Sequence, residues 1–331
     1  MTLLRASLAT LAAGVLALGL AACQAAPATQ PTAGATADSG FPITITHAMG
    51  ETTIPERPQR VVALDSSYVD ATLLLGADLV GYAQYRQDPT HPFAPYLGDV
   101  SAATADAVNV GTVAEPDLEK ILALKPDLII SAKVRQEALY PQLAKIAPTV
   151  FSVSTGPTWK ENVVLLGTAL GKQSEAEGIV AAYEKRAAAV GAEILAQRPD
   201  LTYSLLRFAG EDTARLYASD SFIGEIMADM GLPRPASAPD TTASIFVSLS
   251  AEQILQADAG LVLVSTWQPD GAEGDASRAQ RTQFESNPLW QRLSGDVLEV
   301  DDGTFVASVS IQGANAVITK LAEHFGVDPL A

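Results

Sequence analysis

Two segments that lie far apart in the chain carry the same pattern. Asp117 to Ser131 reads DLEKILALKPDLIIS, and Ser250 to Ser265 reads SAEQILQADAGLVLVS. Each segment is a short amphipathic run that leads into an apolar strand, and their alignment places Glu119 over Glu252. Because a helix-to-strand unit recurs in both halves of the chain, we expect two similar lobes, each presenting one carboxylate at an equivalent place.

The first half of the chain alternates short β-rich runs with helical patterns. The expected strands are Arg60–Leu64, Leu79–Ala83, Asp127–Ser131 and Thr149–Val153, and the expected helices are Tyr68–Leu75, Asp117–Leu124, Gln136–Ile146 and Trp159–Leu170. Alternation of this kind is typical of βαβ units and predicts a mainly parallel sheet.

A long helical run separates the two halves. Ser174 to Pro199 is rich in Ala, Glu and Lys, begins with a capping residue and ends at a proline. A continuous helix of about 24 residues would be about 36 Å long. It could be an ordinary surface helix, but its place near mid-chain favours a rigid strut that joins the lobes.

The second half repeats the plan. The expected strands are Leu201–Phe208, Ala214–Ala218, Gly260–Ser265 and Asp296–Val300, and the expected helices are Phe222–Met230, a helix capped by Ser250 and Ile311–Phe325. Pro269–Gln283 is polar with little periodicity and is interpreted as a mobile loop. The predicted fold class is α/β, with two βαβ-type lobes, central mainly parallel sheets and one long connecting helix.

The N-terminus has the pattern of a secretory signal. Arg5 precedes an apolar run that ends in Leu20-Ala21-Ala22-Cys23, as in a signal peptide. About 17 apolar residues could barely span a bilayer, so a retained anchor helix is the alternative. The ending resembles the bacterial lipobox, whose cysteine receives a diacylglycerol. Cys23 is also the only cysteine, so it forms no internal disulfide or multi-thiolate metal site.

The segment after Cys23 is small, polar and proline-bearing, and it is expected to be a flexible tether. Two acyl chains on the cysteine would hold the protein lastingly at the outer face of the cytoplasmic membrane. The expected segments are a signal peptide over residues 1–22, a lipidated tether over 23–40, an N-terminal lobe over 41–172, a connecting helix over 173–199 and a C-terminal lobe over 200–331.

Charge and motifs exclude several function classes. The formal net charge of −17 argues against nucleic acid as a partner, and the sequence shows no nucleophile elbow, P-loop or dinucleotide fingerprint of an enzyme. A bare-metal site needs several converging ligands, whereas the chain has only three histidines: His47, His91 and His324. We therefore expect no directly bound metal and no permanent cofactor.

The order of several short motifs points to a known family. They are IPERPQRVVAL (Ile54–Leu64), LGADLVGYA (Leu75–Ala83), LEKILALKPDLII (Leu118–Ile130), IAPTV (Ile146–Val150), ALGK (Ala169–Lys172), SFIGEIMADMGLPRP (Ser221–Pro235), LSAEQIL (Leu249–Leu255) and NPLWQRL (Asn287–Leu293). With them the chain resembles the substrate-binding lipoproteins of ABC importers for ferric siderophores, haem and cobalamin, whose lobes are joined by one helix. The segment at Ser221–Pro235 is more similar to the iron-siderophore branch.

The resemblance implies a partner and a role for the repeated glutamates. In this family a glutamate on each lobe docks into arginine pockets of a dimeric ABC permease, which works with a cytoplasmic ATPase. The matching positions are Glu119 and Glu252. Paired carboxylates on two lobes also suit a two-fold partner on physical grounds. Alternatively, both simply interact favourably with a helix dipole. The binding protein itself is expected to be a monomer.

Arginine is suited to a ferric siderophore, whose iron is already wrapped in oxygen donors. Arg207 and Arg215 flank a turn at Gly210–Asp212, so a hairpin would place them opposite each other on one face, with Tyr217 in the same parity. Facing like charges hint at a ligand between them, unless Glu211 or Asp212 pairs with them. Hydroxamate, catecholate and citrate complexes all fit this chemistry.

Tyr85 and Arg86 follow an expected strand, in a loop where open parallel sheets bind ligands, and Trp267 follows the strand that ends at Ser265. Trp159 is a candidate because it begins an expected helix after a Gly-Pro turn. Phe305 is a candidate only through the resemblance, because proteins of the family often carry an aromatic residue near this position. The expected function is capture of a ferric siderophore between the lobes and delivery to an ABC permease. Haem (with His91 or a tyrosine as ligand), cobalamin, and a sensor or adhesion role on this fold are the alternatives.

Overall fold

The computed structural model describes residues 40–85 and 92–330. All the strands and helices described below belong to one compact unit, Thr36–Ala331. The expected signal peptide with Cys23, and also Arg86 and His91, lie outside the described residues. No helix in the described ranges combines the length and apolar character needed to cross a membrane.

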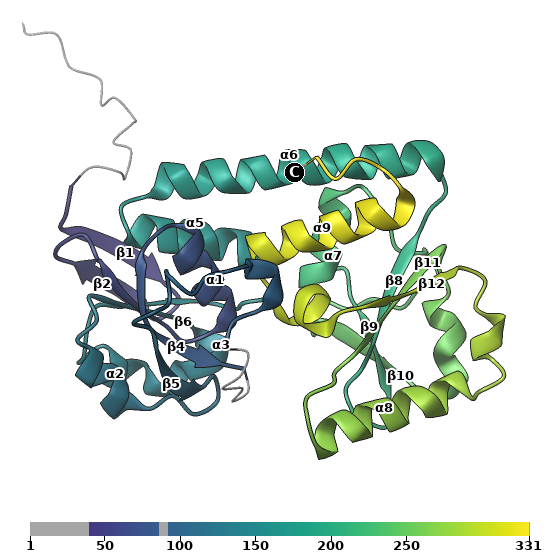
Figure 1. Cartoon of the computed structure of the whole chain (residues 1–331), viewed down its shortest axis with the longest axis horizontal. Helices are drawn as coiled ribbons and strands as arrows, with labels where there is room; N and C mark the ends of the chain where they lie inside the picture. The colour runs from purple at the N-terminus through teal and green to yellow at the C-terminus, as the bar shows by residue number, and fades with distance from the viewer. Residues whose placement is uncertain (1–39, 86–91, 331) are drawn as a thin grey trace, which may run out of the picture. The chain divides into compact units, whose positions relative to one another are not determined.

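The N-terminal lobe is built on a parallel sheet with the strand order β5-β4-β3-β6-β7 (Figure 1). Its strands are β3 (Arg60–Ala63), β4 (Asp78–Gln84), β5 (Val108–Thr112), β6 (Leu128–Ala132) and β7 (Thr149–Ser152), and its main helices are α1 (Ser66–Leu74), α2 (Leu118–Leu124) and α5 (Trp159–Ala169). An antiparallel hairpin, β1 (Ile43–His47) with β2 (Gly50–Ile54), precedes the sheet. The parallel sheet expected from the βαβ pattern is confirmed.

The C-terminal lobe has a mixed sheet with the strand order β10-β9-β8-β11-β12. Its strands are β8 (Tyr203–Phe208), β9 (Ala214–Tyr217), β10 (Phe246–Leu249), β11 (Leu261–Thr266) and β12 (Asp296–Val300), and its helical elements are α7 (Phe222–Asp229), the 3₁₀ segment η3 (Ala251–Ala257), α8 (Ala272–Glu285) and α9 (Ile311–Phe325). Strand β11 pairs in parallel with β8 and β12, whereas β9 pairs antiparallel with both β8 and β10.

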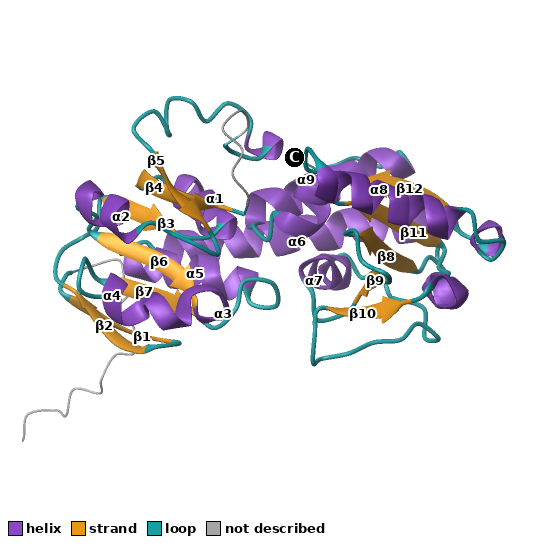
Figure 2. Cartoon of the chain, turned by 90° about the horizontal axis from the view of Figure 1, so that it is seen from below, coloured by secondary structure: helices purple, strands orange, loops and turns teal. Residues whose placement is uncertain are grey.

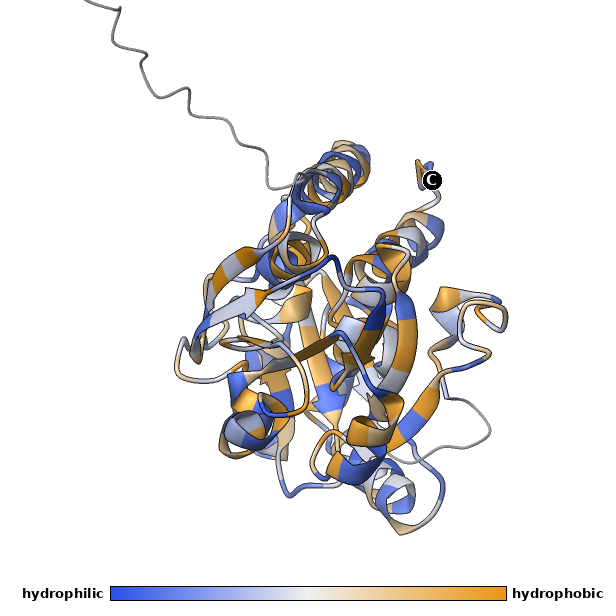
Figure 3. Cartoon of the chain, turned by 90° about the vertical axis from the view of Figure 1, so that its left-hand side faces the viewer, coloured by the Kyte–Doolittle hydropathy of each residue, from blue (hydrophilic) through white to orange (hydrophobic). Residues whose placement is uncertain are grey.

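One long helix, α6 (Gln173–Gln197), runs along both lobes, and α9 lies beside it (Figures 1 and 2). Its buried residues, among them Tyr183, Val190 and Ile194, pack against α5, α7 and α9. Figure 3 shows how hydrophobic and hydrophilic residues alternate along the helices. A single apolar cluster extends from Ile45 to Ala322 and includes residues of both sheets and of α6. The lobes therefore share one apolar cluster, and each lobe has a further cluster of its own.

Two glycines of α6 give a matched test of this packing. A Cβ added at Gly191 would lie 1.7 Å from the carbonyl oxygen of Met230 at the end of α7, whereas a Cβ at Gly178 would meet nothing within 4 Å. We expect Gly191→Ala to lower the free energy of unfolding by about 1–3 kcal/mol or more, because backbone must move. Gly178→Ala should raise it by about 0.5–1 kcal/mol. Urea unfolding of both variants checks this, and equal effects would contradict the close α6–α7 contact.

Several expected elements differ in the structure. The predicted mobile loop Pro269–Gln283 is wrong, because most of it forms the polar helix α8. Its buried face consists of Gly274, Ser277, Gln280 and Phe284, which is too polar to show an apolar period. Gln280 supplies the stabilising bonds, since its side chain accepts from the Gly210 amide and donates to the Thr213 carbonyl.

The remaining differences are smaller. The single helix predicted over Gln136–Ile146 is interrupted: α3 (Lys133–Gln136) and the 3₁₀ turn η2 (Glu137–Leu139) are followed by a separate short turn, α4 (Tyr140–Leu143), which has Pro141 near its start. Strands β1, β2, β5 and β10 were not predicted. The limits given above for the tether, the lobes and the connecting helix stay predictions.

Candidate ligand-binding cleft

A cleft of about 1330 Å³ is lined by residues of both lobes. The N-terminal lobe contributes the end of β4 with Tyr85 and the segment Pro92–Leu97, and the C-terminal lobe contributes the residues after β11 and β12. Carboxyl ends of parallel strands are the usual place for a ligand in an open α/β sheet. The volume exceeds the range of about 300–1,000 Å³ that is common for small-ligand pockets, so a bulky ligand fits.

Two aromatic side chains from opposite lobes meet in this cleft. The rings of Tyr85 and Trp267 are 6.4 Å apart and nearly perpendicular, and both residues line the cleft. Tyr85 is 49 % exposed. Partly exposed rings in a cleft offer apolar surfaces to a flat ligand. Both were candidate ligand residues from the sequence.

Arg207 lies beneath Trp267, with its guanidinium carbon 5.6 Å from the ring centre. It is only 8 % exposed and binds the Asp302 carboxylate through two nitrogens, at 2.6 and 2.7 Å. Asp302 also accepts from the Ser265 hydroxyl at 2.7 Å, and Arg207 donates to the Tyr217 hydroxyl at 3.4 Å. Burial alone would lower the pKa of Arg207, but Tyr217 and Asp302 outweigh it and hold the pKa above the usual value. The guanidinium is therefore fixed and charged.

Arg215 is the direct cross-strand partner of Arg207, as the hairpin argument predicted. It stacks on the Phe246 ring at 4.6 Å and pairs with Glu211, whose pKa is lowered chiefly by this hydrogen bond. Each arginine thus has its own carboxylate, Glu211 or Asp302. Their facing positions do not by themselves require an anionic ligand.

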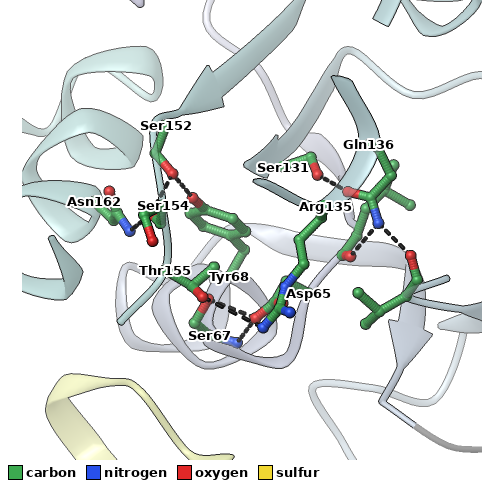
Figure 4. Close-up of polar contacts among 12 residues, drawn as sticks. Asp65, Ser67, Tyr68, Ser131, Arg135, Gln136, Ser152, Ser154, Thr155 and Asn162 are labelled. Atoms are coloured by element: carbon green, nitrogen blue, oxygen red, sulfur yellow. Dashed lines mark hydrogen bonds and ion pairs between the residues drawn. The ribbon is translucent and has the colours of Figure 1, made fainter. Parts of the chain in front are cut away.

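A second buried ion pair, which the sequence did not suggest, lies in the N-terminal lobe (Figure 4). Arg135 donates from Nε to the Asp65 carboxylate at 2.9 Å and from a terminal nitrogen to Thr155 at 3.4 Å. The side chain of Asp65 is 3 % exposed and caps α1 by accepting from the Ser67 amide. The Arg135 guanidinium lies 5.5 Å from the Tyr85 ring centre. The sequence signal that could have found Arg135 is its position shortly after an expected strand, which is the signal that made Arg86 a candidate.

These residues form a row that crosses from one lobe to the other: Arg135, Tyr85, Trp267 and Arg207. We call it the cross-cleft row. A carboxylate fixes the guanidinium at each end, and ring surfaces lie in the middle. Such an arrangement suits a chelate with ring or carbonyl surfaces and outward oxygen acceptors, because a fixed arginine loses little entropy when it binds oxygen.

The C-terminal wall of the cleft also carries carboxylates: Asp270, Glu273, Glu299, Asp301 and Asp302. Glu299 pairs with Arg281 at 2.8 Å, and Asp301 accepts from the Thr304 amide and hydroxyl. The cleft lining therefore offers carboxylate acceptors directly, while the Arg135 and Arg207 guanidiniums lie beside the Tyr85 and Trp267 rings and are not part of the lining.

Arg207 and Arg215 are not among the residues that line the cleft, and three other predicted residues also lie away from it. Trp159 is 1 % exposed and packs edge-on against Tyr183 and Phe222 in the core. Phe305 is buried in the turn Gly303–Ala307. Tyr217 is buried beside Arg207 and contacts it rather than the cleft.

The two repeated glutamates occupy equivalent places. Glu119 lies in the first turn of α2, which leads to β6, and Glu252 lies in the first turn of η3, which leads to β11. Asp117 caps the first helix, and a capping box of Ser250 and Gln253 begins the second. Both glutamates are exposed. The repeat in the sequence thus becomes one exposed carboxylate on each lobe.

The described histidines lie away from the cleft. His47 bonds with Thr52 beside Tyr140, and burial lowers its pKa, while His324 packs on Phe325 in α9. Within residues 40–85 and 92–330, no cluster of three or more His, Cys, Asp or Glu side chains is placed to hold a metal ion.

Comparison with known proteins agrees with the two-lobe α/β fold described above. A model of the periplasmic binding protein family matches residues 61–294. The chain is 34% identical over 293 residues to the Bacillus subtilis protein named "Probable siderophore-binding lipoprotein YfiY", covering 85% of this chain and 87% of the relative. It is 29% identical to the Fe(3+)-citrate-binding protein YfmC of the same organism, covering 77% of each chain.

Solved structures give the same result. SirA of Staphylococcus aureus, complexed with staphyloferrin B, has a TM-score of 0.78 and 29% identity, with 87% of this chain and 99% of SirA covered. FeuA of Bacillus subtilis, complexed with ferri-bacillibactin, has a TM-score of 0.69 at 20% identity, covering 87% of this chain and 100% of FeuA, and shares the fold. From its sequence and its two-lobe α/β fold, the chain belongs to the periplasmic binding protein family, whose members are ligand-binding proteins.

Proposed function

We propose that this protein captures a ferric siderophore in the cleft between its lobes and delivers it to an ABC permease for iron uptake. The observation that carries the proposal is the cross-cleft row. The fold supports it, because the chain matches siderophore-bound SirA over most of both chains. Because a siderophore already surrounds the iron with oxygen atoms, the protein needs donors and ring surfaces rather than metal ligands.

Delivery rests on Glu119 and Glu252. Two exposed carboxylates at equivalent places on two lobes can each meet one subunit of a two-fold permease. Charge complementarity would orient the complex and speed the encounter more than it would raise affinity. Attachment through a lipid on Cys23 would keep the protein close to its permease at the outer face of the membrane.

The ligand experiment is a fluorescence titration with residues 36–331, the unit that contains every described strand and helix. The panel consists of ferric citrate, ferric staphyloferrin B, a ferric tris-catecholate and a ferric trihydroxamate, with haem and cobalamin as comparators. We expect saturable quenching at sub-micromolar concentration by at least one ferric complex. A response to haem or cobalamin alone would contradict the proposal.

The tryptophans report where the ligand binds. Trp267 lines the cleft, whereas Trp159 is buried in the core. Trp267→Phe should remove most of the quenching and weaken binding about threefold to tenfold, as expected for loss of part of one stacking surface. Trp159→Phe should leave the quenching and the affinity close to those of the unmodified protein. Calorimetry measures affinity independently of fluorescence. Unchanged quenching in Trp267→Phe would place the ligand elsewhere.

A further inference from the structure

A buried carboxylate, distinct from the ion pairs of the cross-cleft row, lies where the two lobes join. Asp70 belongs to α1 of the N-terminal lobe and is 1 % exposed. Its Oδ2 accepts from the Ser310 hydroxyl at 2.6 Å, and its Oδ1 accepts from the Gln312 amide at 3.1 Å. Both donors belong to the N-terminal end of α9, 240 and 242 residues further along the chain. One side chain thus ties α1 to α9.

The α9 end of this tie is a helix cap. The Ser310 hydroxyl accepts from the Gly313 amide at 3.1 Å while it donates to Asp70. Behind the cap, α9 packs on α1, α5, α6 and α7. A shift of the α9 N-terminus on α1 would therefore change how the C-terminal chain segment sits on the N-terminal lobe.

The same carboxylate reaches the ligand cleft through Tyr96. The Tyr96 side chain lies near Asp70, whose charge acts on its hydroxyl, and Tyr96 lines the cleft. It belongs to the 3₁₀ turn η1 (Pro95–Leu97), which packs against α9. Asp70 therefore connects a cleft-wall side chain to the seam between the lobes, although Asp70 itself is out of reach of the ligand.

The bonding pattern depends on the protonation state of Asp70. Serine, glutamine and tyrosine can all donate to it, which suits an ionised carboxylate with several acceptor sites. A protonated carboxyl must itself donate, so one of these bonds has to reverse or break. Burial raises the pKa of Asp70 to about 7, while Ser310, Gln312 and Tyr96 oppose the rise. The carboxyl is therefore protonated below and ionised above neutral pH.

Other titratable groups around Asp70 are few in the described chain. Tyr96 faces it from η1, and its pKa is raised by burial and by the charge of Asp70. Asp65, at the N-terminus of α1, acts on Tyr96 in the same direction. The first turn of α9 contains no acidic residue and offers the neutral donors Ser310 and Gln312. Asp70 is thus the group in this cluster that titrates near neutral pH.

We propose that Asp70 is a positioning residue for ligand capture: its ionised form holds Tyr96 in the cleft wall and the α9 N-terminus on α1, so ligand affinity falls when Asp70 is protonated. The inference rests on the proposed function, because it concerns the affinity for a ferric siderophore. The expected loss on acidification is about threefold to tenfold, the equivalent of one hydrogen bond of ordinary net strength.

The first experiment measures calorimetric affinity for ferric staphyloferrin B from pH 5.5 to 8.5 in the unmodified protein and in Asp70→Asn. The asparagine amide resembles the protonated carboxyl in shape and charge. We expect the variant to bind at every pH as weakly as the unmodified protein does at low pH. Comparing the two proteins at each pH removes the effect of pH on the siderophore itself. A variant with the same pH profile and affinity as the unmodified protein would overturn the proposal.

The second experiment needs no ligand and separates the two proposals. Hydrogen exchange of the first turn of α9, corrected for intrinsic rates, should show greater protection at pH 8 than at pH 6, and this difference should vanish in Asp70→Asn. If no ferric complex binds but this difference is found, the proposed function fails while the Asp70 tie stands. A pH-independent protection in the unmodified protein overturns the tie whatever binds.

A matched pair of serines guards against simple misfolding. Ser310 and Ser221 both begin a Ser-x-x-Gly sequence and both cap a helix by accepting from the glycine amide at 3.1 Å. Ser221 donates to the Ala218 carbonyl instead of a carboxylate. Ser310→Ala should lower affinity and shift the midpoint of the pH profile, whereas Ser221→Ala should change neither. Identical profiles in the two variants would reduce Ser310 to a helix cap and contradict the proposal.

Discussion

Replacing Arg207 by alanine is expected to have the largest effect on both folding and binding. The change removes the bidentate partner of Asp302, whose side chain is 6% exposed, and leaves a buried charge without a counter-ion. Breaking a buried pair in this way costs about 3–5 kcal/mol. We therefore expect the free energy of unfolding to fall by that amount and ligand binding to be lost. Denaturant unfolding and calorimetry measure the two effects.

The opposite strand provides the control. Arg215 faces Arg207 in register, but its partner Glu211 is more exposed, so Arg215→Ala should cost only about 0.2–1 kcal/mol. The double variant Arg207→Met with Asp302→Asn removes both charges and should restore much of the stability without restoring binding. A double variant that is folded and binds as tightly as the unmodified protein would show that Arg207 acts only through stability.

The second large effect is expected in transport rather than in binding. In the variant with both Glu119→Gln and Glu252→Gln, we expect siderophore uptake and ligand-stimulated ATPase activity of the permease to fall by tenfold or more. Affinity for the ligand should stay the same, because both residues are exposed and lie in helix first turns outside the cleft lining. Each single variant should have a smaller effect, since one lobe can still dock. Reconstituted permease with the purified variant measures this.

Two other exposed glutamates, Glu56 and Glu193, serve as controls with the same change in charge. Converting both to glutamine should leave transport unchanged. If the docking pair acts only as helix N-terminal carboxylates, its replacement should cost a few tenths of a kcal/mol in stability, roughly 0.3–1 kcal/mol at most, and leave transport intact. That result would contradict the docking role.

The sequence predicted those parts of the fold that depend on local pattern. The β8–β9 hairpin placed Arg207 and Arg215 opposite each other, because register follows from the alternation of side chains around a short turn. Helix α6 was predicted from its composition and from the proline that follows it, although its N-cap is Lys172 and not the expected Ser174. By contrast, α8 was missed because its buried face is made of small and polar residues.

The candidate site was less predictable, because its polar pairs join distant parts of the chain. Arg207 and Asp302 are separated by 95 positions, and Arg135 and Asp65 by 70. No local pattern reports such a pair, so Asp302 was missed as the partner of Arg207, whereas the local pairing of Arg215 with Glu211 was among the stated alternatives. Trp159 was a candidate from its place after a turn, but its indole lies in the core beside Tyr183.

The most direct test of the account is calorimetry with a ferric siderophore and its iron-free form, using residues 36–331. The prediction is sub-micromolar binding of ferric staphyloferrin B or ferric citrate, with much weaker binding of the iron-free molecule, because only the chelate holds its oxygens in the fixed arrangement that the cross-cleft row can meet. Binding of haem or cobalamin, with no heat from any ferric complex of the panel, would contradict the claim that this cleft captures a ferric siderophore.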